Sequence, residues 1–303
     1  AGCSGHSKNL KFGAADIGGV YYSFASTFTQ LADKEIDGYT FETKTTAGSV
    51  ANLRLISDGY IDLAIVQADL LSDAYNATGT FADKKYQKGY KAIASLYTEC
   101  CQIVVRKDSG ITGIDDLINK TVSVGASESG SEKNAEQILK MSGITDELIN
   151  KVNMDYTEAA EKLKAGEIDA FFCTAGTRTE VIGQLSKECD ICLISLDDKC
   201  IDKMLSAYSL CEKYTIPAGT YNGQDSDVTT IGVKAVLIAK QSLSDDVIKN
   251  VTKTIYEHAD DFKYATSLDI SFDINTAADG VDIPFHSGAA AYYTERGINV
   301  LTE

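Results

Sequence analysis

The stretch VSVGASESGSEKN, from Val122 to Asn134, has the pattern of a strand, a loop of small hydroxyl residues and the start of a helix. The strand stops at Gly125, and Ser129 followed by Glu132 forms a capping-box pattern that predicts Ser129 as the N-cap. Helix N-termini leave backbone N–H groups unsatisfied and carry partial positive charge. The stretch therefore predicts an anion site, held by N–H and hydroxyl donors because the loop has no Lys or Arg.

Two familiar phosphate-binding patterns do not fit this loop. Gly125 and Gly130 have the spacing of a P-loop, but Ser131 and Glu132 stand where Lys and Ser/Thr are required. The dinucleotide pattern Gly-x-Gly-x-x-Gly is absent from it. An ordinary capped helix after a strand remains the alternative interpretation.

The elements around this stretch repeat an earlier part of the chain. Gly59-Tyr60-Ile61-Asp62 matches Gly166-Glu167-Ile168-Asp169, and Gly13-Ala14 matches Gly125-Ala126. Each time, the pattern of apolar residues predicts a β-α-β-α-β unit. The first unit has strands at 10–13, 39–45 and 62–67 and helices at 21–34 and from 48 to about 58. The second has strands at 121–125, 151–156 and 168–174 and helices at 131–141 and 157–165.

The whole chain suits two domains, because 303 residues can form two cores. Two extended segments, 92–106 and 229–239, predict a hinge between the units, and residues 243–303 are predicted to be mostly helical and to pack on the first unit. The net charge of −16 argues against nucleic acid or an anionic lipid surface as partner. No apolar run approaches the length of a membrane span.

Ligands of open parallel sheets bind at the carboxyl ends of the strands, so we expect the site between the two units. In the first unit the candidate ligand-binding residues are Gly19, Tyr21, Tyr22, Ser49, Val50 and Gln67. In the second unit they are Ser127, Ser129, Gly130, Ser131, Ala175, Gly176, Thr177 and Arg178. The guanidinium of Arg178 could clamp a carboxylate through two hydrogen bonds, and the alternative is a surface ion pair.

The eight cysteines suggest an exported chain with free thiols. Cys3 in Ala1-Gly2-Cys3-Ser4-Gly5 fits the processed end of a bacterial lipoprotein signal, which predicts lipidation of Cys3 and a tether over residues 1–9. A tail cysteine without that role is the alternative. Cys189, Cys192, Cys200 and Cys211 could form a metal set, but no His lies nearby, so we predict no metal site and no cofactor.

Several longer motifs resemble one family, the TAXI-type solute receptors of tripartite ATP-independent periplasmic (TRAP) transporters. The similarity runs from about residue 10 to 300. In the first half the matching motifs are Gly18-Gly19-Val20-Tyr21-Tyr22, residues 46–53 (TAGSVANL), residues 62–67 (DLAIVQ) and residues 104–110 (VVRKDSG). In the second half they are residues 123–125 with 129–131, residues 168–172 with 174–176, residues 216–221 with 223–225, and His286 with residues 288–290. The motif at 216–221 adds Tyr221 to the ligand-binding candidates.

The resemblance implies an α/β, two-lobed type II periplasmic-binding fold, each lobe a mostly parallel sheet flanked by helices and joined by a strand hinge. We place lobe 1 at residues 10–97 plus 220–303 and lobe 2 at 98–219. It implies an extracytoplasmic, lipid-anchored or periplasmic receptor, expected to be monomeric, that delivers a small carboxylate such as glutamate, glutamine or 2-oxoglutarate to an ion-driven TRAP permease. Arg178 departs from the family, in which Pro is frequent at this position, and so does the Cys-rich stretch 189–211.

Two other functions remain open from the sequence. A sensory domain would use the same pocket and differ only in its partner. An enzyme on this scaffold would need a base, a nucleophile or a metal at the strand ends, where we find only hydroxyls, one Gln and one Arg. We therefore predict a binding protein that is not an enzyme.

Overall fold

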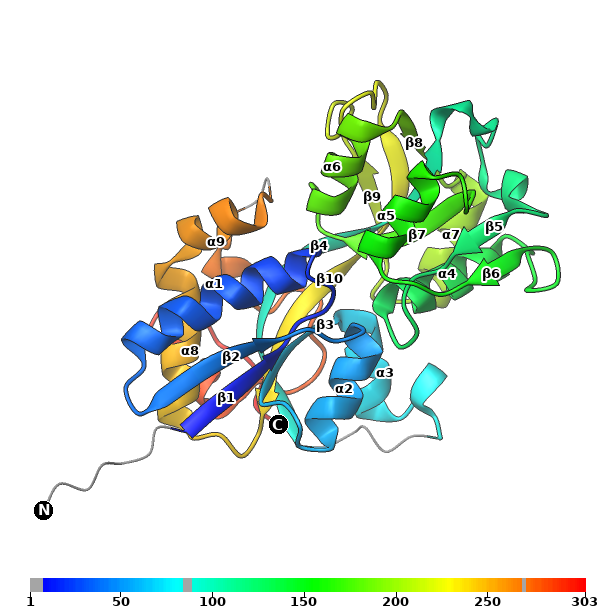
Figure 1. Ribbon diagram of the computed structural model, residues 1–303. Coiled ribbons are helices and arrows are strands. Elements are labelled where there is room, and N and C mark those ends of the chain that lie inside the picture. The colour runs from blue at the N-terminus through cyan, green and yellow to red at the C-terminus, as the bar shows by residue number, and fades with distance from the viewer. Residues whose placement is uncertain (1–7, 84–88, 269–270) are drawn as a thin grey trace, which may run out of the picture.

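The computed structural model describes residues 8–83, 89–268 and 271–303, and it has two lobes joined by long strands (Figure 1). Cys3 lies outside the described residues. The first lobe contains β1–β3, α1–α3 and α8–α10, and the second contains β5–β9 and α4–α7 (Figure 1). This arrangement confirms the predicted two-lobed α/β fold.

The strands of the described residues are β1 (Lys8–Gly13), β2 (Tyr39–Lys44), β3 (Leu63–Gln67), β4 (Tyr90–Arg106), β5 (Thr121–Ser123), β6 (Asn150–Val152), β7 (Ala170–Ala175), β8 (Ile191–Leu193), β9 (Glu212–Ile216) and β10 (Val228–Lys240). The α-helices are α1 (Val20–Glu35), α2 (Ser49–Ser57), α3 (Ala68–Asn76), α4 (Gly130–Met141), α5 (Tyr156–Lys164), α6 (Glu180–Glu188), α7 (Asp198–Ala207), α8 (Asp245–Glu257), α9 (Ala259–Thr266) and α10 (Ser287–Thr294). Short 3₁₀ helices occupy Gly79–Phe81, Lys107–Ser109, Ile114–Leu117 and Ile274–Thr276.

One mixed sheet runs through both lobes, in the order β2-β1-β3-β10-β4-β7-β5-β6. The strands β1, β2 and β3 are parallel, as are β5, β6 and β7. The two long strands are antiparallel to each other. The strand β10 pairs with β3 of the first lobe and β9 of the second, whereas β4 pairs with β7 and β8 of the second lobe. The segment 92–106, predicted as an extended segment at the hinge, is therefore part of one continuous strand.

The repeated Gly-x-Ile-Asp motif ends a helix in the same way in both lobes. Gly59 and Gly166 adopt positive φ angles of 83° and 75°, just after α2 and α5. The following N–H groups, of Tyr60 and Glu167, donate to carbonyls in the last turn of each helix at 2.9 Å. This is the Schellman cap, which favours glycine because an L side chain is strained at positive φ.

The aspartate of each motif then fixes the start of the next strand. Asp62 Oδ2 accepts the N–H of Lys11 at 2.9 Å, and Asp169 Oδ2 accepts the N–H of Thr121 at 2.8 Å. In each lobe, this bond joins the last strand of the unit to its first strand. The repeated Gly-x-Ile-Asp motif thus has the same structural role in both lobes. The prediction of two similar β-α-β-α-β units is confirmed.

The strand predicted at residues 151–156 is wrong in its length. The strand β6 ends at Val152, and Asp155 is the N-cap of α5, where its carboxylate accepts the N–H of Glu158 at 2.8 Å. Tyr156 therefore lies in the first turn of a helix. The strand β1, in turn, begins at Lys8, two residues before the predicted start.

Each lobe buries an apolar layer on its part of the sheet. In the second lobe, Val122, Ile138 and Phe172 belong to a core formed by β5, β7, α4 and α7. In the first lobe, Phe24 of α1 stacks on Phe262 of α9 with ring centroids 4.4 Å apart. The C-terminal helices thus cover α1, as predicted for residues 243–303.

No helix among residues 8–83, 89–268 and 271–303 is long and apolar enough to cross a bilayer. In the same residues, the seven cysteines are free thiols, and no group of His, Cys, Asp and Glu side chains is arranged to hold a metal ion.

Candidate functional site

A small cavity lies between the lobes, at the carboxyl ends of the parallel strands. Its lining comes from both lobes and consists of Ala15, Gly19, Val20, Tyr21, Gly48, Ser49, Gln67, Glu99, Ser129, Gly130, Tyr156, Thr174 and Ala175. The cavity therefore suits a small solute.

The structure brings about half of the predicted site residues together around this cavity. The predicted residues that line it are Gly19, Tyr21, Ser49, Gln67, Ser129, Gly130 and Ala175. The predicted residues that do not line it are Tyr22, Val50, Ser127, Ser131, Gly176, Thr177, Arg178 and Tyr221. The lining residues that were not among the predicted ones are Ala15, Val20, Gly48, Glu99, Tyr156 and Thr174.

Two helices of the first lobe present uncapped N-termini to the cavity. The N-cap residues of α1 and α2 are Gly19 and Gly48, which have no side chain that could accept from the first-turn N–H groups. These N–H groups have no acceptor within their own helix. Together with the helix dipoles, they make a wall that favours a negatively charged group.

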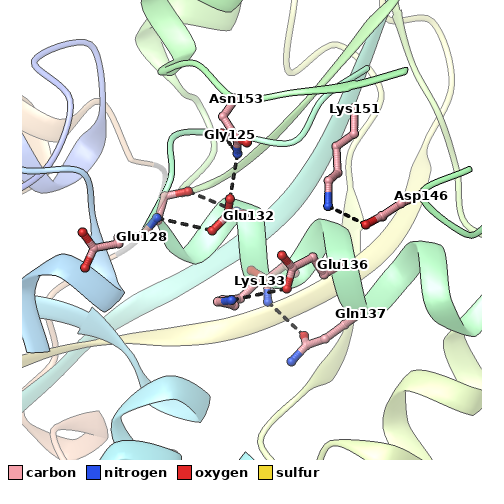
Figure 2. Close-up of polar contacts among 11 residues, drawn as sticks. Gly125, Glu128, Glu132, Lys133, Glu136, Gln137, Asp146, Lys151 and Asn153 are labelled. Atoms are coloured by element: carbon pink, nitrogen blue, oxygen red, sulfur yellow. Dashed lines mark hydrogen bonds and ion pairs between the residues drawn. The ribbon is translucent and has the colours of Figure 1, made fainter. Parts of the chain in front are cut away.

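The second lobe contributes the N-terminus of α4, as the stretch from Val122 to Asn134 predicts. Ser129 Oγ accepts the N–H of Glu132 at 3.1 Å, which confirms Ser129 as the N-cap. The return bond of the capping box differs from the prediction, because the Glu132 carboxylate accepts from the N–H of Glu128 at 3.3 Å (Figure 2). Asn153 donates to Glu132 at 2.7 Å and to the Gly125 carbonyl at 2.9 Å, which fixes the loop in front of the helix (Figure 2).

Ser131 supports the wall of the cavity from behind. Its hydroxyl lies 3.0 Å from the Tyr156 hydroxyl and accepts the N–H of Thr174 at 2.8 Å. Tyr156 in turn donates to the Thr174 carbonyl at 3.0 Å. These bonds hold α4, α5 and the end of β7 together, so Ser131 positions the side of the cavity that Tyr156 and Thr174 form.

Tyr221 belongs to a buried network beside the long strands. Its hydroxyl donates to Gln102 Oε1 and accepts the N–H of Thr179 at 3.0 Å. Gln102 completes the network by donating to Thr179 Oγ1 at 2.9 Å. The hydroxyl of Tyr221 is thus occupied by protein groups outside the cavity. A motif alone could not distinguish this structural contact from a ligand contact.

Arg178 lies on the surface of the second lobe. Its side chain is exposed and lies outside the cavity lining. Within the described residues, it takes part in no ion pair. Its neighbour Thr177 is half-buried, and its hydroxyl lies 3.2 Å from that of Tyr214.

Glu99 of β4 is the acidic side chain of the cavity lining, and it is only 2% exposed. Tyr21 donates its phenolic proton to Glu99 Oε2 at 2.6 Å. Burial raises the pKa of the Glu99 carboxyl to about 8, against the opposing effect of the bond from Tyr21. Burial also raises the pKa of Tyr21 well above its usual value, so Tyr21 remains a donor.

The sequence did contain a signal for Glu99. It stands inside a long run of apolar β-forming residues, from Tyr90 to Arg106, that crosses between the lobes. Glutamate is almost never fully buried unless it is paired. A lone acid at such a position is therefore a candidate for a functional site.

The sequence of the chain matches one family over nearly its whole length. Residues 12–297 match the NMT1-like family. The chain belongs to the NMT1-like family. The assignment to TAXI-type receptors, which the sequence motifs suggest, is narrower than the family that this match shows.

The fold of this NMT1-like chain is similar to that of solved periplasmic binding proteins. One is the periplasmic binding protein BugD, with a TM-score of 0.61, 11% identity, and coverage of 90% of each chain. Another is PhnD1 from Prochlorococcus marinus in complex with methylphosphonate, with a TM-score of 0.60, 13% identity, and coverage of 89% of this chain and 94% of that one. A third is a putative L-cystine ABC transporter protein from Listeria monocytogenes, with a TM-score of 0.54, 13% identity, and coverage of 89% and 98%.

Polar contacts between the lobes hold the NMT1-like chain in a closed state. The carbonyl of Glu128 accepts the N–H of Ala51 at 3.0 Å, and its carboxylate forms a two-bond ion pair with Arg54 at 2.8 and 3.1 Å. On the other side of the cavity, Asp16 Oδ2 accepts the N–H of Thr157 at 3.2 Å and its hydroxyl at 3.0 Å. These contacts exist only while the lobes are together.

Replacing Asp16 by alanine should weaken ligand binding about three- to tenfold. The variant loses two hydrogen bonds to a partly exposed carboxylate in the closed state alone, which is worth about 1 kcal/mol. Isothermal titration of a bound solute would measure the change. Thr157→Ser keeps both donors and should bind as the wild type does, and equal affinities for Asp16→Ala and the wild type would contradict this role.

Proposed function

We propose that this chain is an extracytoplasmic solute-binding receptor that captures a small carboxylate between its lobes. The observation that carries the proposal is the cavity between the lobes at which the N-termini of α1, α2 and α4 meet. A ligand that touches both lobes favours the closed state by its greater affinity for that state. This is the behaviour expected of a receptor that binds and releases its solute.

The chemistry of the lining favours a carboxylate group over a phosphate group. Among the described residues, no Lys or Arg lines the cavity, so its donors are N–H groups and hydroxyls. Such donors stabilise a singly charged carboxylate group, whereas the doubly charged group of a phosphate ester would call for cationic partners. A carboxylate of the glutamate, glutamine or 2-oxoglutarate kind fits this donor set.

We further propose that the receptor is of the TAXI type and delivers its solute to a TRAP permease. The motifs that carry the resemblance supply much of the cavity lining, including Gly19, Tyr21, Ser49, Gln67 and Gly130. In this proposal the chain lies outside the cytoplasmic membrane, periplasmic or anchored there by lipid on Cys3. The similar fold of BugD and PhnD1 supports solute binding in general.

Thermal unfolding with a panel of solutes tests the proposed function. The panel contains glutamate, glutamine and 2-oxoglutarate, together with methylphosphonate and methanesulfonate. A solute at about one hundred times its dissociation constant should stabilise the protein by about 2.7 kcal/mol. We expect stabilisation by a carboxylate and a matching bound mass in native mass spectrometry. Stabilisation by the phosphonate or sulfonate alone, or by no solute, would contradict the proposal.

A further inference from the structure

The carboxyl group of Glu99 conflicts with a ligand that carries negative charge alone. Glu99 lines the same small cavity as the helix N-termini of Gly19, Gly48 and Ser129. Two carboxylates in one enclosed site repel each other and raise each other's pKa. A simple carboxylate would therefore bind only while Glu99 stays protonated, whereas a ligand that also carries a positive charge could pair with ionised Glu99.

The surroundings of Glu99 provide acceptors that lack donors. Tyr21 supplies one hydrogen bond to Oε2, and no described residue donates to the other oxygen of Glu99. Gln67 is 2% exposed and lines the same cavity, and its Oε1 is buried without a hydrogen-bond partner. Buried acceptors of this kind are costly unless a donor reaches them. One end of the cavity thus presents a carboxyl and an amide oxygen to whatever the cavity holds.

We propose that Glu99, assisted by Gln67 Oε1, binds the ammonium group of a zwitterionic solute, so that the ligand is an α-amino acid. This inference rests on the proposed function and narrows it. The carboxylate of the solute lies at the helix N-termini, and its ammonium group donates to Glu99 and Gln67. The buried charges are then paired, which a deaminated analogue such as 2-oxoglutarate cannot achieve.

No protein group takes the place of the ammonium. The described titratable groups that face Glu99 are acids, phenols or thiols, with no Lys, Arg or His among them. They are Tyr21, Tyr97, Asp69, Tyr156, Cys100 and Cys173. A positive charge that balances ionised Glu99 must therefore come from the ligand.

This pairing couples binding to the release of a proton. With the lobes together and no ligand bound, burial raises the pKa of the Glu99 carboxyl to about 8, so the group is mostly protonated in that state at pH 7. A neighbouring ammonium favours the charged form and lowers this pKa, so binding releases the proton. Affinity should therefore rise with pH between pH 6 and pH 8. The pKa of Asp69 is raised by burial to about 6, so its contribution falls at the low end of this range.

Titration of matched solutes against wild type and Glu99→Gln tests the proposal. The probes are L-glutamate with its deaminated counterpart glutarate, L-glutamine with glutaramate, and the remaining standard L-amino acids. The wild type should prefer an amino acid over its deaminated counterpart by about thirtyfold or more. Glu99→Gln should bind that amino acid at least about tenfold more weakly, with the preference largely lost. Glu42→Gln, on the exposed face of β2, serves as the control and should match the wild type.

Each outcome tests either the inferred ammonium site or the proposed receptor function on which that site rests. Equal affinity for an amino acid and its deaminated counterpart overturns the ammonium site and leaves a carboxylate receptor. Binding of methylphosphonate or methanesulfonate alone, or of no probe, overturns the proposed function as well. If Glu99→Gln does not fold, calorimetry of the wild type in buffers of different ionisation enthalpy replaces it. Uptake of about one proton per ligand at pH 7 contradicts the proposal.

Discussion

Replacing Gly130 by valine is expected to weaken ligand binding about ten- to hundredfold without destabilising the ligand-free protein. A Cβ atom built on Gly130 would lie 2.5 Å from Cδ of Gln67, which belongs to the opposite lobe. The clash exists only in the closed state, where overpacking costs about 1–3 kcal/mol. In the open state the lobes are apart, and the first position of α4 tolerates a side chain. Titration of a bound solute would measure the loss of affinity, and urea unfolding without solute would show an unchanged midpoint.

Gly183→Val is the matched control for this variant. Gly183 lies in α6 of the same lobe, and a Cβ atom there would meet open space. The control should bind as the wild type does. Wild-type affinity in Gly130→Val would contradict the close approach of the lobes at Gln67.

Replacing Asn52 by leucine should lower the free energy of unfolding by about 2–3 kcal/mol. The Asn52 side chain has no exposed surface, and its amide donates to the carbonyls of Ala14 at 2.7 Å and Ile65 at 3.0 Å. It also accepts from the hydroxyl of Thr46 at 2.7 Å. Leucine has a similar size but leaves these buried groups without their partner, and each such group costs about 1–3 kcal/mol. Urea unfolding of the two proteins would measure the difference.

Asn76→Leu provides the control for the Asn52 variant. Asn76 is exposed at the end of α3, where its amide donates to the Ser72 carbonyl at 2.9 Å. Exposed changes of this kind usually alter stability by about 0.5 kcal/mol or less. Equal unfolding midpoints for the two variants would show that Asn52 does not hold the strand ends together.

The fold could be predicted from the sequence because its local signals repeat. Gly59 and Gly166 end helices at positive φ, and Asp62 and Asp169 each fix a strand start, so both lobes carry the same short motif. Strand ends were less predictable. Asp155 reads as part of a strand until its capping bond to Glu158 is known.

The site was predicted only in part, because its residues come from distant parts of the sequence, and the hinge between the lobes brings them together. Ser129 and Gly130 follow from a local pattern, and the structure places both on the cavity. Glu99 stands in a strand that crosses between lobes, where the direction of one side chain depends on the whole sheet. Tyr221 has a plausible motif, but its hydroxyl is occupied by Gln102 and Thr179.

Small-angle X-ray scattering with and without solute tests the central claim most directly. The claim is that the two lobes close on a small carboxylate. With a saturating carboxylate from the thermal panel, we expect the radius of gyration to fall to the value of the closed structure, and Gly130→Val to need about ten to one hundred times more of the solute for the same fall. An unchanged radius of gyration in the wild type with every carboxylate of the panel would contradict the claim.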